Sequence, residues 1–207
     1  MDAVHILRNS RIVPVVNIDD PATAVPLAET LLEAGFDVVE VTLRTPRALD
    51  SIEIIATAFP DTCVGAGSVR TATQFAQVKE AGAQFAVSPG YSESLLEAAE
   101  EHEMPFVPGA TTASDIIRLQ ECGYSLVKFF PAELAGGTKM LRALGAPLPE
   151  IRFFPTGGIT PELAPAYLNL GNVACIGGSW IAPSDLIAAS NFKIIAKLAQ
   201  TAANLVP

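Results

Sequence analysis

The sequence is poor in cysteine and has no long apolar run, and each shortage excludes a class of protein. Its three cysteines, Cys63, Cys122 and Cys175, are an odd number at wide spacings, so neither a disulfide framework nor a zinc pattern is predicted. Because free cysteine is usually buried, we expect all three to be small buried hydrophobic residues. No run of about 18 apolar residues is present, and the N-terminal segment lacks a signal-peptide pattern. We therefore expect a cytoplasmic protein that does not span a membrane.

Positive charge is also scarce. The chain has 13 lysines and arginines against 22 aspartates and glutamates, which gives a net charge of −9 at pH 7. Such a surface repels nucleic acid and anionic membranes, so neither is an expected partner. Any phosphate site must be local, built from backbone amides and a few cations. Hydrophobic residues make up 50% of the 207 residues and charged ones 17%, which predicts a single compact domain over residues 1–207.

Short apolar runs alternate with amphipathic segments along the chain. The expected strands are residues 12–18, 38–43, 63–68, 85–89, 105–108, 126–131, 152–156 and 173–177. The expected helices are residues 22–34, 46–59, 73–81, 92–103, 112–122, 134–144, 162–170 and 186–205. Strands separated by helices pair in parallel, so the pattern predicts a compact (β/α)8 TIM barrel with short loops, its base capped by an N-terminal helix over residues 2–9. An open doubly wound sheet is the alternative.

Residues with special backbone preferences mark several expected boundaries. Four glycines follow predicted helices and suit left-handed C-terminal positions, namely Gly35, Gly82, Gly123 and Gly171. Three polar residues that precede proline are predicted helix N-caps, namely Asp20, Thr45 and Thr160. The boundaries matter because such barrels carry their chemistry at the C-terminal ends of the strands.

The predicted strand at residues 38–43 carries polar side chains on one face. Because side chains alternate along a strand, Glu40, Thr42 and Arg44 point to one side and the apolar residues between them to the other. The apolar face should meet the helices, which directs the polar face into the barrel. A buried charge is costly unless it is paired or used. Two interpretations follow, a structural Glu40–Arg44 ion pair or a functional site inside the barrel.

Lys128 is the one lysine in a predicted strand. The others, Lys79, Lys139, Lys193 and Lys197, lie in predicted helices, where solvent can hydrate them. Burial disfavours the charged form of an amine, and the neutral form is the one that attacks a carbonyl carbon. Lys128 is therefore a candidate nucleophile. The alternatives are a lysine that snorkels to the barrel mouth or one that binds a phosphate as a point charge.

Paired glycines occur at the ends of the last two predicted strands, where barrels of this class recurrently bind phosphate. Gly157-Gly158 follows one strand, and Gly177-Gly178 ends the other. Glycine lets backbone amides approach an anion closely. The sequence therefore predicts a phosphate site here, with tight turns alone as the alternative.

Histidine is scarce as well, since the sequence has only His5 and His102. Neither follows a predicted strand, so neither a metal centre with imidazole ligands nor a Ser-His-Asp hydrolase is predicted. A GxGxxG fingerprint and a P-loop are also absent. These absences leave Lys128 and Glu40 as the groups whose chemistry needs an explanation.

Six segments form an ordered set of motifs along the chain, namely residues 40–45 (EVTLRT), 65–69 (GAGSV), 88–90 (SPG), 128–133 (KFFPAE), 154–159 (FPTGGI) and 175–180 (CIGGSW). Together they resemble the 2-keto-3-deoxy-6-phosphogluconate (KDPG) aldolases, a family that also acts on 4-hydroxy-2-oxoglutarate (KHG). Any one segment is weak evidence, but six in the same order over almost the whole chain are specific. The resemblance implies a class I aldolase that cleaves KDPG to pyruvate and glyceraldehyde 3-phosphate, and KHG to pyruvate and glyoxylate.

The resemblance also implies roles for individual residues. Lys128 would form the Schiff base, Glu40 would be the general acid and base, and Arg44 and Ser68 would hold the substrate carboxylate region. The residues implied in packing around the keto acid or in binding its phosphate are Pro89, Phe130, Gly157, Gly158, Gly178 and Ser179. The family usually has threonine at the Ser68 position, so we expect looser positioning with the hydroxyl retained.

The resemblance further implies a homotrimer that needs no metal or cofactor and binds a small phosphorylated keto acid. Three alternatives stay open. A galactonate-series aldolase would differ in its stereochemical preference at C4. A sugar-phosphate isomerase or epimerase would form no covalent imine. A non-enzymatic sugar-phosphate binder would not need both Glu40 and Lys128 inside the barrel.

Overall fold

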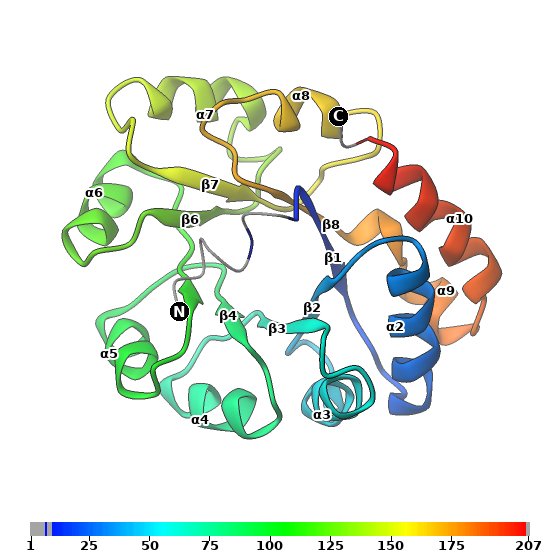
Figure 1. The fold of residues 1–207 in the computed structure, drawn as a ribbon. Coiled ribbons are helices and arrows are strands. Elements are labelled where there is room, and N and C mark those ends of the chain that lie inside the picture. The colour runs from blue at the N-terminus through cyan, green and yellow to red at the C-terminus, as the bar shows by residue number, and fades with distance from the viewer. Residues whose placement is uncertain (1–6, 8–9, 206–207) are drawn as a thin grey trace.

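The computed structural model describes Leu7 and residues 10–205, in which strands and helices alternate (Figure 1). The strands are β1 (Ile12–Val16), β2 (Val38–Thr42), β3 (Cys63–Gly67), β4 (Phe85–Val87), β5 (Phe106–Val107), β6 (Leu126–Phe129), β7 (Arg152–Pro155) and β8 (Ile176–Gly178). The α-helices are α2 (Ala24–Glu33), α3 (Ala48–Ala58), α4 (Ala72–Glu80), α5 (Glu93–Glu101), α6 (Ala113–Glu121), α7 (Gly137–Gly145), α8 (Ala164–Leu168), α9 (Ser184–Ala188) and α10 (Phe192–Ala203). Short 3₁₀ helices are η1 (Pro21–Thr23) and η2 (Ser179–Ile181).

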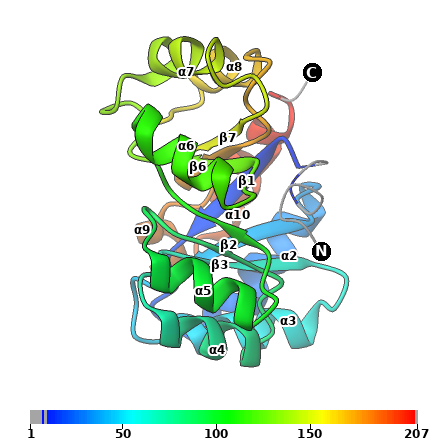
Figure 2. The same ribbon diagram turned by 90° about the vertical axis from the view of Figure 1, so that its left-hand side faces the viewer.

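The strands form a closed ring of parallel pairs. Six strands pair in the order β5-β4-β3-β2-β1-β8, and β6 pairs separately with β7. The isolated parallel bridges that join these two ladders are Gly109–Lys128, Phe153–Val173 and Thr156–Gly177. The helices surround the strands in Figure 1, and the view turned by 90° in Figure 2 shows the same layering. The predicted (β/α)8 barrel is confirmed, and the open doubly wound sheet is wrong.

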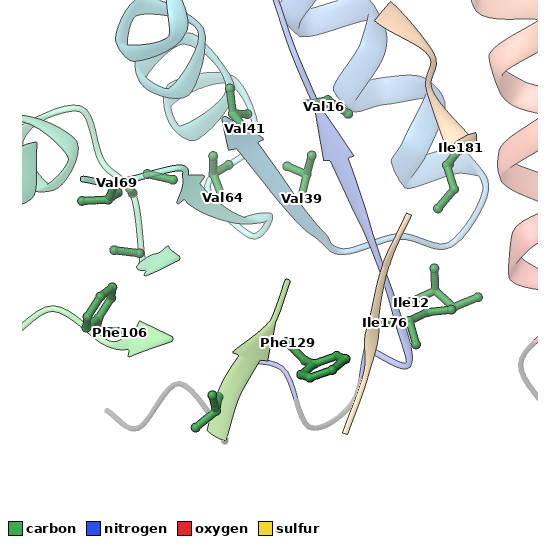
Figure 3. Close-up of a cluster of buried hydrophobic side chains, with 14 of the residues drawn as sticks. Ile12, Val16, Val39, Val41, Val64, Val69, Phe106, Phe129, Ile176 and Ile181 are labelled. Atoms are coloured by element: carbon green, nitrogen blue, oxygen red, sulfur yellow. The ribbon is translucent and has the colours of Figure 1, made fainter. Parts of the chain in front are cut away.

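The outer face of the strands packs against the helices. In α2, Leu27, Ala28 and Leu31 recur at spacings of three and four residues, which places them on one buried face. Val39 and Val41 of β2 belong to the same buried layer (Figure 3), as the alternation of side chains along a strand predicts. In the part of the chain that the structure describes, no helix is both long and apolar enough to cross a membrane.

A second apolar cluster fills the inside of the barrel. It comprises Leu7, Val13, Val38, Phe85, Val87, Val107, Leu126, Phe154 and Cys175. Val38 and Leu126 precede Glu40 and Lys128 by two residues, so each pair shares one face of its strand. Glu40 and Lys128 therefore lie one layer closer to the C-terminal ends of the strands. Apart from Leu7, the N-terminal helix predicted over residues 2–9 lies outside the described residues.

The last predicted helix, over residues 186–205, is divided into α9 and α10. Ser190 adopts a left-handed backbone conformation with a φ of 52°, which ends the first segment. The Asn191 side chain then accepts a hydrogen bond from the Ile194 N–H and caps α10. The prediction of one continuous helix is wrong because apolar periodicity does not report a single residue with this backbone conformation.

The capping predictions are partly wrong. The glycines that adopt the predicted left-handed conformation are Gly35, Gly82 and Gly123. Gly171 does not adopt it, because α8 ends at Leu168 and leaves Gly171 beyond the capping position. Asp20 caps η1 as predicted. Thr45 and Thr160 cap no helix, because their hydroxyls donate to acceptors outside α3 and α8 instead of accepting from a helical N–H.

The cysteines are less buried than predicted. Cys175 is buried, Cys63 is half-buried and Cys122 is exposed, and all three are free thiols. Cys122 occupies the C-cap of α6, where the chain turns at the surface. The prediction of burial is therefore wrong for Cys122.

Replacing Phe85 with alanine should destabilise the barrel interior. The Phe85 ring is fully buried and packs on Gly65, where an added Cβ would lie 2.1 Å from the ring. Because the surrounding strands cannot close over the lost ring, the free energy of unfolding should fall by about 3–5 kcal/mol in chemical denaturation. Ile117→Ala, at a position 45% exposed on α6, is the control and should change it by less than about 0.5 kcal/mol. Equal losses in both variants would contradict this account of the core.

Candidate active site

Lys128 and Glu40 meet inside the barrel. Lys128 projects from β6 and Glu40 from β2, and their side chains are 3% and 0% exposed. Lys128 Nζ donates a hydrogen bond to Glu40 Oε1 at 3.1 Å. The interpretation of Lys128 as a lysine that snorkels to the mouth is wrong, because its side chain does not reach solvent. The remaining lysines are exposed, as predicted.

Glu40 does not pair with Arg44. The Arg44 side chain is exposed, and its Nε donates a hydrogen bond to Ser68 Oγ at 3.1 Å. The predicted alternative of a structural Glu40–Arg44 ion pair is therefore wrong. The buried carboxylate interacts with Lys128 instead, and the guanidinium lies at the mouth of the barrel, where an anion can reach it.

The Glu40 carboxylate fits against Gly67 of the neighbouring strand β3. An added Cβ at Gly67 would lie 2.1 Å from Glu40 Oε1, so only glycine leaves room for the carboxylate at this point. The second oxygen, Glu40 Oε2, is buried and has no hydrogen-bond partner among the described residues. One oxygen of the carboxylate therefore holds the amine, and the other has lone pairs left to accept a proton.

A cavity of about 470 Å³ opens at the C-terminal ends of the strands. It is lined by Leu43, Arg44, Ser68, Arg70, Pro89 and Phe130. The structure thus brings together the four side chains predicted to contact the carboxylate and the keto acid. Phe130 connects the cavity with the buried pair, since its ring centroid is 5.8 Å from Lys128 Nζ. Arg70 was not among the predicted site residues, although a cation two residues after Ser68 was a signal that could have identified it.

Ser68 holds its backbone in the left-handed region, with a φ of 59°. This conformation is uncommon for residues other than glycine and is more strained for β-branched residues such as threonine. The Ser68 hydroxyl accepts the hydrogen bond from Arg44, which ties the two side chains together at the cavity wall. Looser positioning than with threonine stays a prediction.

The glycine loops after β7 and β8 lie next to each other, joined by an isolated parallel bridge. Gly157 and Gly158 have left-handed backbones, with φ of 102° and 79°. Their N–H groups donate no hydrogen bond to any described residue. Gly178 ends β8, and the exposed Ser179 follows it. The two loops therefore offer amides and a hydroxyl that suit an anion.

Cys175 is a second potential nucleophile near Glu40. Burial raises the pKa of the Cys175 thiol, and the Glu40 carboxylate raises this pKa further. The thiol therefore stays neutral, whereas a reactive cysteine needs the thiolate. Lys128 differs because the neutral form of an amine is its nucleophilic form. Within the described residues, no group of three or more histidine, cysteine or acidic side chains could hold a metal ion.

The fold and the site together define a class of protein. A closed parallel barrel that buries an amine against a carboxylate, beside a cavity lined by arginines, is the arrangement of barrel enzymes that form an imine with a keto acid. Residues 3–198 match the family model of the KDPG and KHG aldolases, and the chain belongs to this family.

Relatives resemble the chain over nearly its whole length. The 2-dehydro-3-deoxy-phosphogluconate aldolase of Pseudoalteromonas atlantica is 48% identical over 191 residues, which cover 92% of this chain and 89% of the relative. The KHG/KDPG aldolase of Escherichia coli is 46% identical over 200 residues, 97% of this chain and 94% of the relative. The crystal structure of KDPG aldolase from Legionella pneumophila, with pyruvate captured at low pH as a covalent carbinolamine intermediate, has a TM-score of 0.95 and 42% identity, and the match covers 98% of both chains.

Replacing Gly67 with alanine should displace the Glu40 carboxylate, because the added methyl group would occupy its position. We expect aldolase turnover to fall on the order of 100-fold, as a misplacement of about 1 Å can cause, and a crystal structure to show a longer distance from Lys128 Nζ to Glu40. Gly171→Ala is the control, since nothing lies within 4 Å of a Cβ there and the backbone is not left-handed. Unchanged turnover in Gly67→Ala would show that the position of this carboxylate does not matter.

Proposed function

We propose that this chain is a class I aldolase that forms a Schiff base on Lys128. It cleaves KDPG to pyruvate and glyceraldehyde 3-phosphate, and KHG to pyruvate and glyoxylate. The observation that carries the proposal is the buried contact of 3.1 Å between Lys128 and Glu40, next to a cavity lined by Arg44 and Ser68. The covalent carbinolamine of pyruvate in the Legionella pneumophila relative supports it.

Imine formation begins when the neutral amine of Lys128 attacks the C2 ketone of the substrate. The proton that the ammonium must lose passes to Glu40, and the net charge of the buried pair stays the same, so the transfer adds no charge to the dry interior. Glu40 then protonates the carbinolamine hydroxyl, directly or through a water molecule. Water leaves, and the nitrogen lone pair forms the C=N bond of the iminium.

Carbon–carbon cleavage follows from the iminium, which accepts electrons. Glu40 takes the proton of the C4 hydroxyl, the C4 oxygen forms a carbonyl, and the electrons of the C3–C4 bond move to C3 and produce an enamine. The aldehyde leaves as glyceraldehyde 3-phosphate from KDPG or as glyoxylate from KHG. Glu40 then gives the proton that it took from the C4 hydroxyl to C3, which regenerates an iminium, and water hydrolyses this iminium to pyruvate and the free amine of Lys128.

Substrate binding divides between the two sides of the barrel mouth. Arg44 and Ser68 hold the C1 carboxylate, with Arg70 as a further positive charge in the same cavity. Pro89 and Phe130 pack around the keto acid. The residues assigned to the phosphate are Gly157, Gly158, Gly178 and Ser179. Local amides and cations of this kind let an acidic protein with a net charge of −9 bind an anion.

The wider organisation of the protein is also a proposal. Residues 1–207 form one domain, this domain assembles as a homotrimer, and the enzyme works in the cytoplasm. The resemblance to the family supports the assembly.

Trapping with borohydride tests the nucleophile directly. After incubation with pyruvate and sodium borohydride, mass spectrometry of the digested protein should find a reduced pyruvyl adduct on the peptide that contains Lys128. Lys128→Arg should form no adduct, because its guanidinium is not nucleophilic, while Lys139→Arg, changed at an exposed lysine, should form as much as the parent. An adduct on another lysine, or none at all, would overturn the proposed mechanism.

Replacing Glu40 with glutamine tests the acid–base role, because the amide keeps the shape of the side chain and cannot carry the proton. We expect kcat for KDPG to fall by roughly 10²–10⁴-fold, the usual contribution of general acid–base catalysis. Circular dichroism should be unchanged. Glu29→Gln, at an exposed position of α2, is the matched control. Full activity in Glu40→Gln would remove Glu40 from the mechanism.

A further inference from the structure

Tyr167 and Glu133 form a hydrogen bond behind the glycine loop that follows β7. Tyr167 lies in α8 and is fully buried. Its hydroxyl donates to Glu133 Oε1. Glu133 lies in the segment after β6, five residues beyond Lys128. The hydrogen bond therefore links the segment that follows the nucleophile to the helix that follows the glycine loop.

Glu133 also contacts the glycine loop itself. Its N–H donates to the Gly157 carbonyl oxygen at 3.1 Å. A Cβ added at Gly158 would lie 2.9 Å from the Cβ of Glu133, so the stem of this side chain packs directly on the Gly158 backbone. The preceding residue, Ala132, donates its N–H to the Thr156 carbonyl oxygen at 2.9 Å. The loop is thus held from one side by the backbone and the side chain of Glu133.

The Tyr167 hydroxyl can act as a permanent hydrogen-bond donor to Glu133 because it stays protonated. Burial raises the pKa of Tyr167, and the hydrogen bond and charge of Glu133 raise it further. A buried phenol that acts as a donor needs an acceptor, and a carboxylate is a strong one. The hydrogen bond therefore fixes the side chain of Glu133, which is an exposed residue.

We propose that the Tyr167–Glu133 hydrogen bond positions the Gly157 and Gly158 amides for the phosphate of the substrate. The inference rests on the proposed function, in which these amides bind that phosphate. Glu133 and Tyr167 are positioning residues, since neither lines the cavity. They determine how strongly the enzyme prefers a phosphorylated keto acid over an unphosphorylated one.

The nucleophile is held independently of this pair. The N–H of Lys128 donates to the Pro108 carbonyl oxygen at 2.8 Å, and its carbonyl oxygen accepts from the Ala110 N–H at 2.9 Å. Loss of the Tyr167 hydroxyl leaves these bonds and the contact with Glu40 in place. The chemistry on the keto acid should therefore survive while recognition of the phosphate weakens.

The test compares two substrates that differ in the phosphate. Tyr167→Phe removes one oxygen, and Glu133→Gln removes the charge and keeps the stem. For Tyr167→Phe we expect KM for KDPG and the inhibition constant of inorganic phosphate to rise roughly tenfold, the effect of losing one hydrogen bond to a charged group. For Glu133→Gln we expect a smaller rise in both constants, because the amide oxygen still accepts from the Tyr167 hydroxyl and the bond loses only its charge assistance. Values of kcat and KM for KHG should stay within about twofold, well below the effect of one such bond. Tyr124→Phe, at a half-buried tyrosine after α6, is the matched control.

Two results would overturn the inference. Equal losses on KDPG and KHG would mean that the pair merely stabilises the fold, and an unchanged KM for KDPG in Tyr167→Phe would mean that the hydrogen bond does not position the amides. Tyr167→Phe, the smaller change, decides the question if Glu133→Gln fails to fold. A parent enzyme that inorganic phosphate does not inhibit would instead refute the phosphate site of the proposed function, and the inference would fall with it.

Discussion

An amine and a carboxylate share the interior of the barrel, and each is tolerated there because the other is present. Taking an isolated charge out of water costs several kcal/mol or more, and an opposite charge at hydrogen-bond distance offsets that cost. The contact of 3.1 Å between Lys128 and Glu40 therefore constrains what surrounds it. Gly67 has no side chain because the carboxylate occupies that space, and the Cys175 thiol beside the pair stays neutral.

The regular geometry of the strands places Lys128 and Glu40 close to the C-terminal end of the barrel, where a substrate can reach them. Successive side chains of a strand point to opposite faces, so they alternate between an outer layer, which packs on the helices, and an inner layer, which fills the barrel. Val38 and Leu126 belong to the inner apolar layer, and the next inward positions on the same strands are Glu40 and Lys128. Lys128 and Glu40 therefore lie above the inner apolar layer, on the side of the barrel mouth, where the cavity and the glycine loops lie.

Much of the fold and of the site could be predicted from the sequence, because the alternation of side chains along a strand is a local property. It identified the inward-facing Glu40, the position of Lys128 in an apolar strand singled out that lysine, and the family resemblance then supplied the side chains of the cavity other than Arg70. What could not be predicted depends on contacts or torsions that periodicity does not contain. The positive φ of Ser190 divides a helix whose apolar pattern is continuous. The bond between Tyr167 and Glu133 joins residues 34 positions apart and exists only once α8 has packed behind the glycine loop.

Lys128 lies at one of the seams where the two ladders of the barrel meet, so its backbone and its side chain have different tasks. The peptide groups on either side of the Lys128 Cα make the hydrogen bonds that close one seam, to Pro108 and from Ala110. Every residue except proline has the N–H and carbonyl that these bonds require. The backbone bonds of this seam therefore do not depend on which side chain, proline excepted, this position carries. At this one residue the backbone closes the barrel and the side chain supplies the reactive group, so a different chemistry at this position would require a change at Glu40, the partner of the side chain, but no change in the strand pairing.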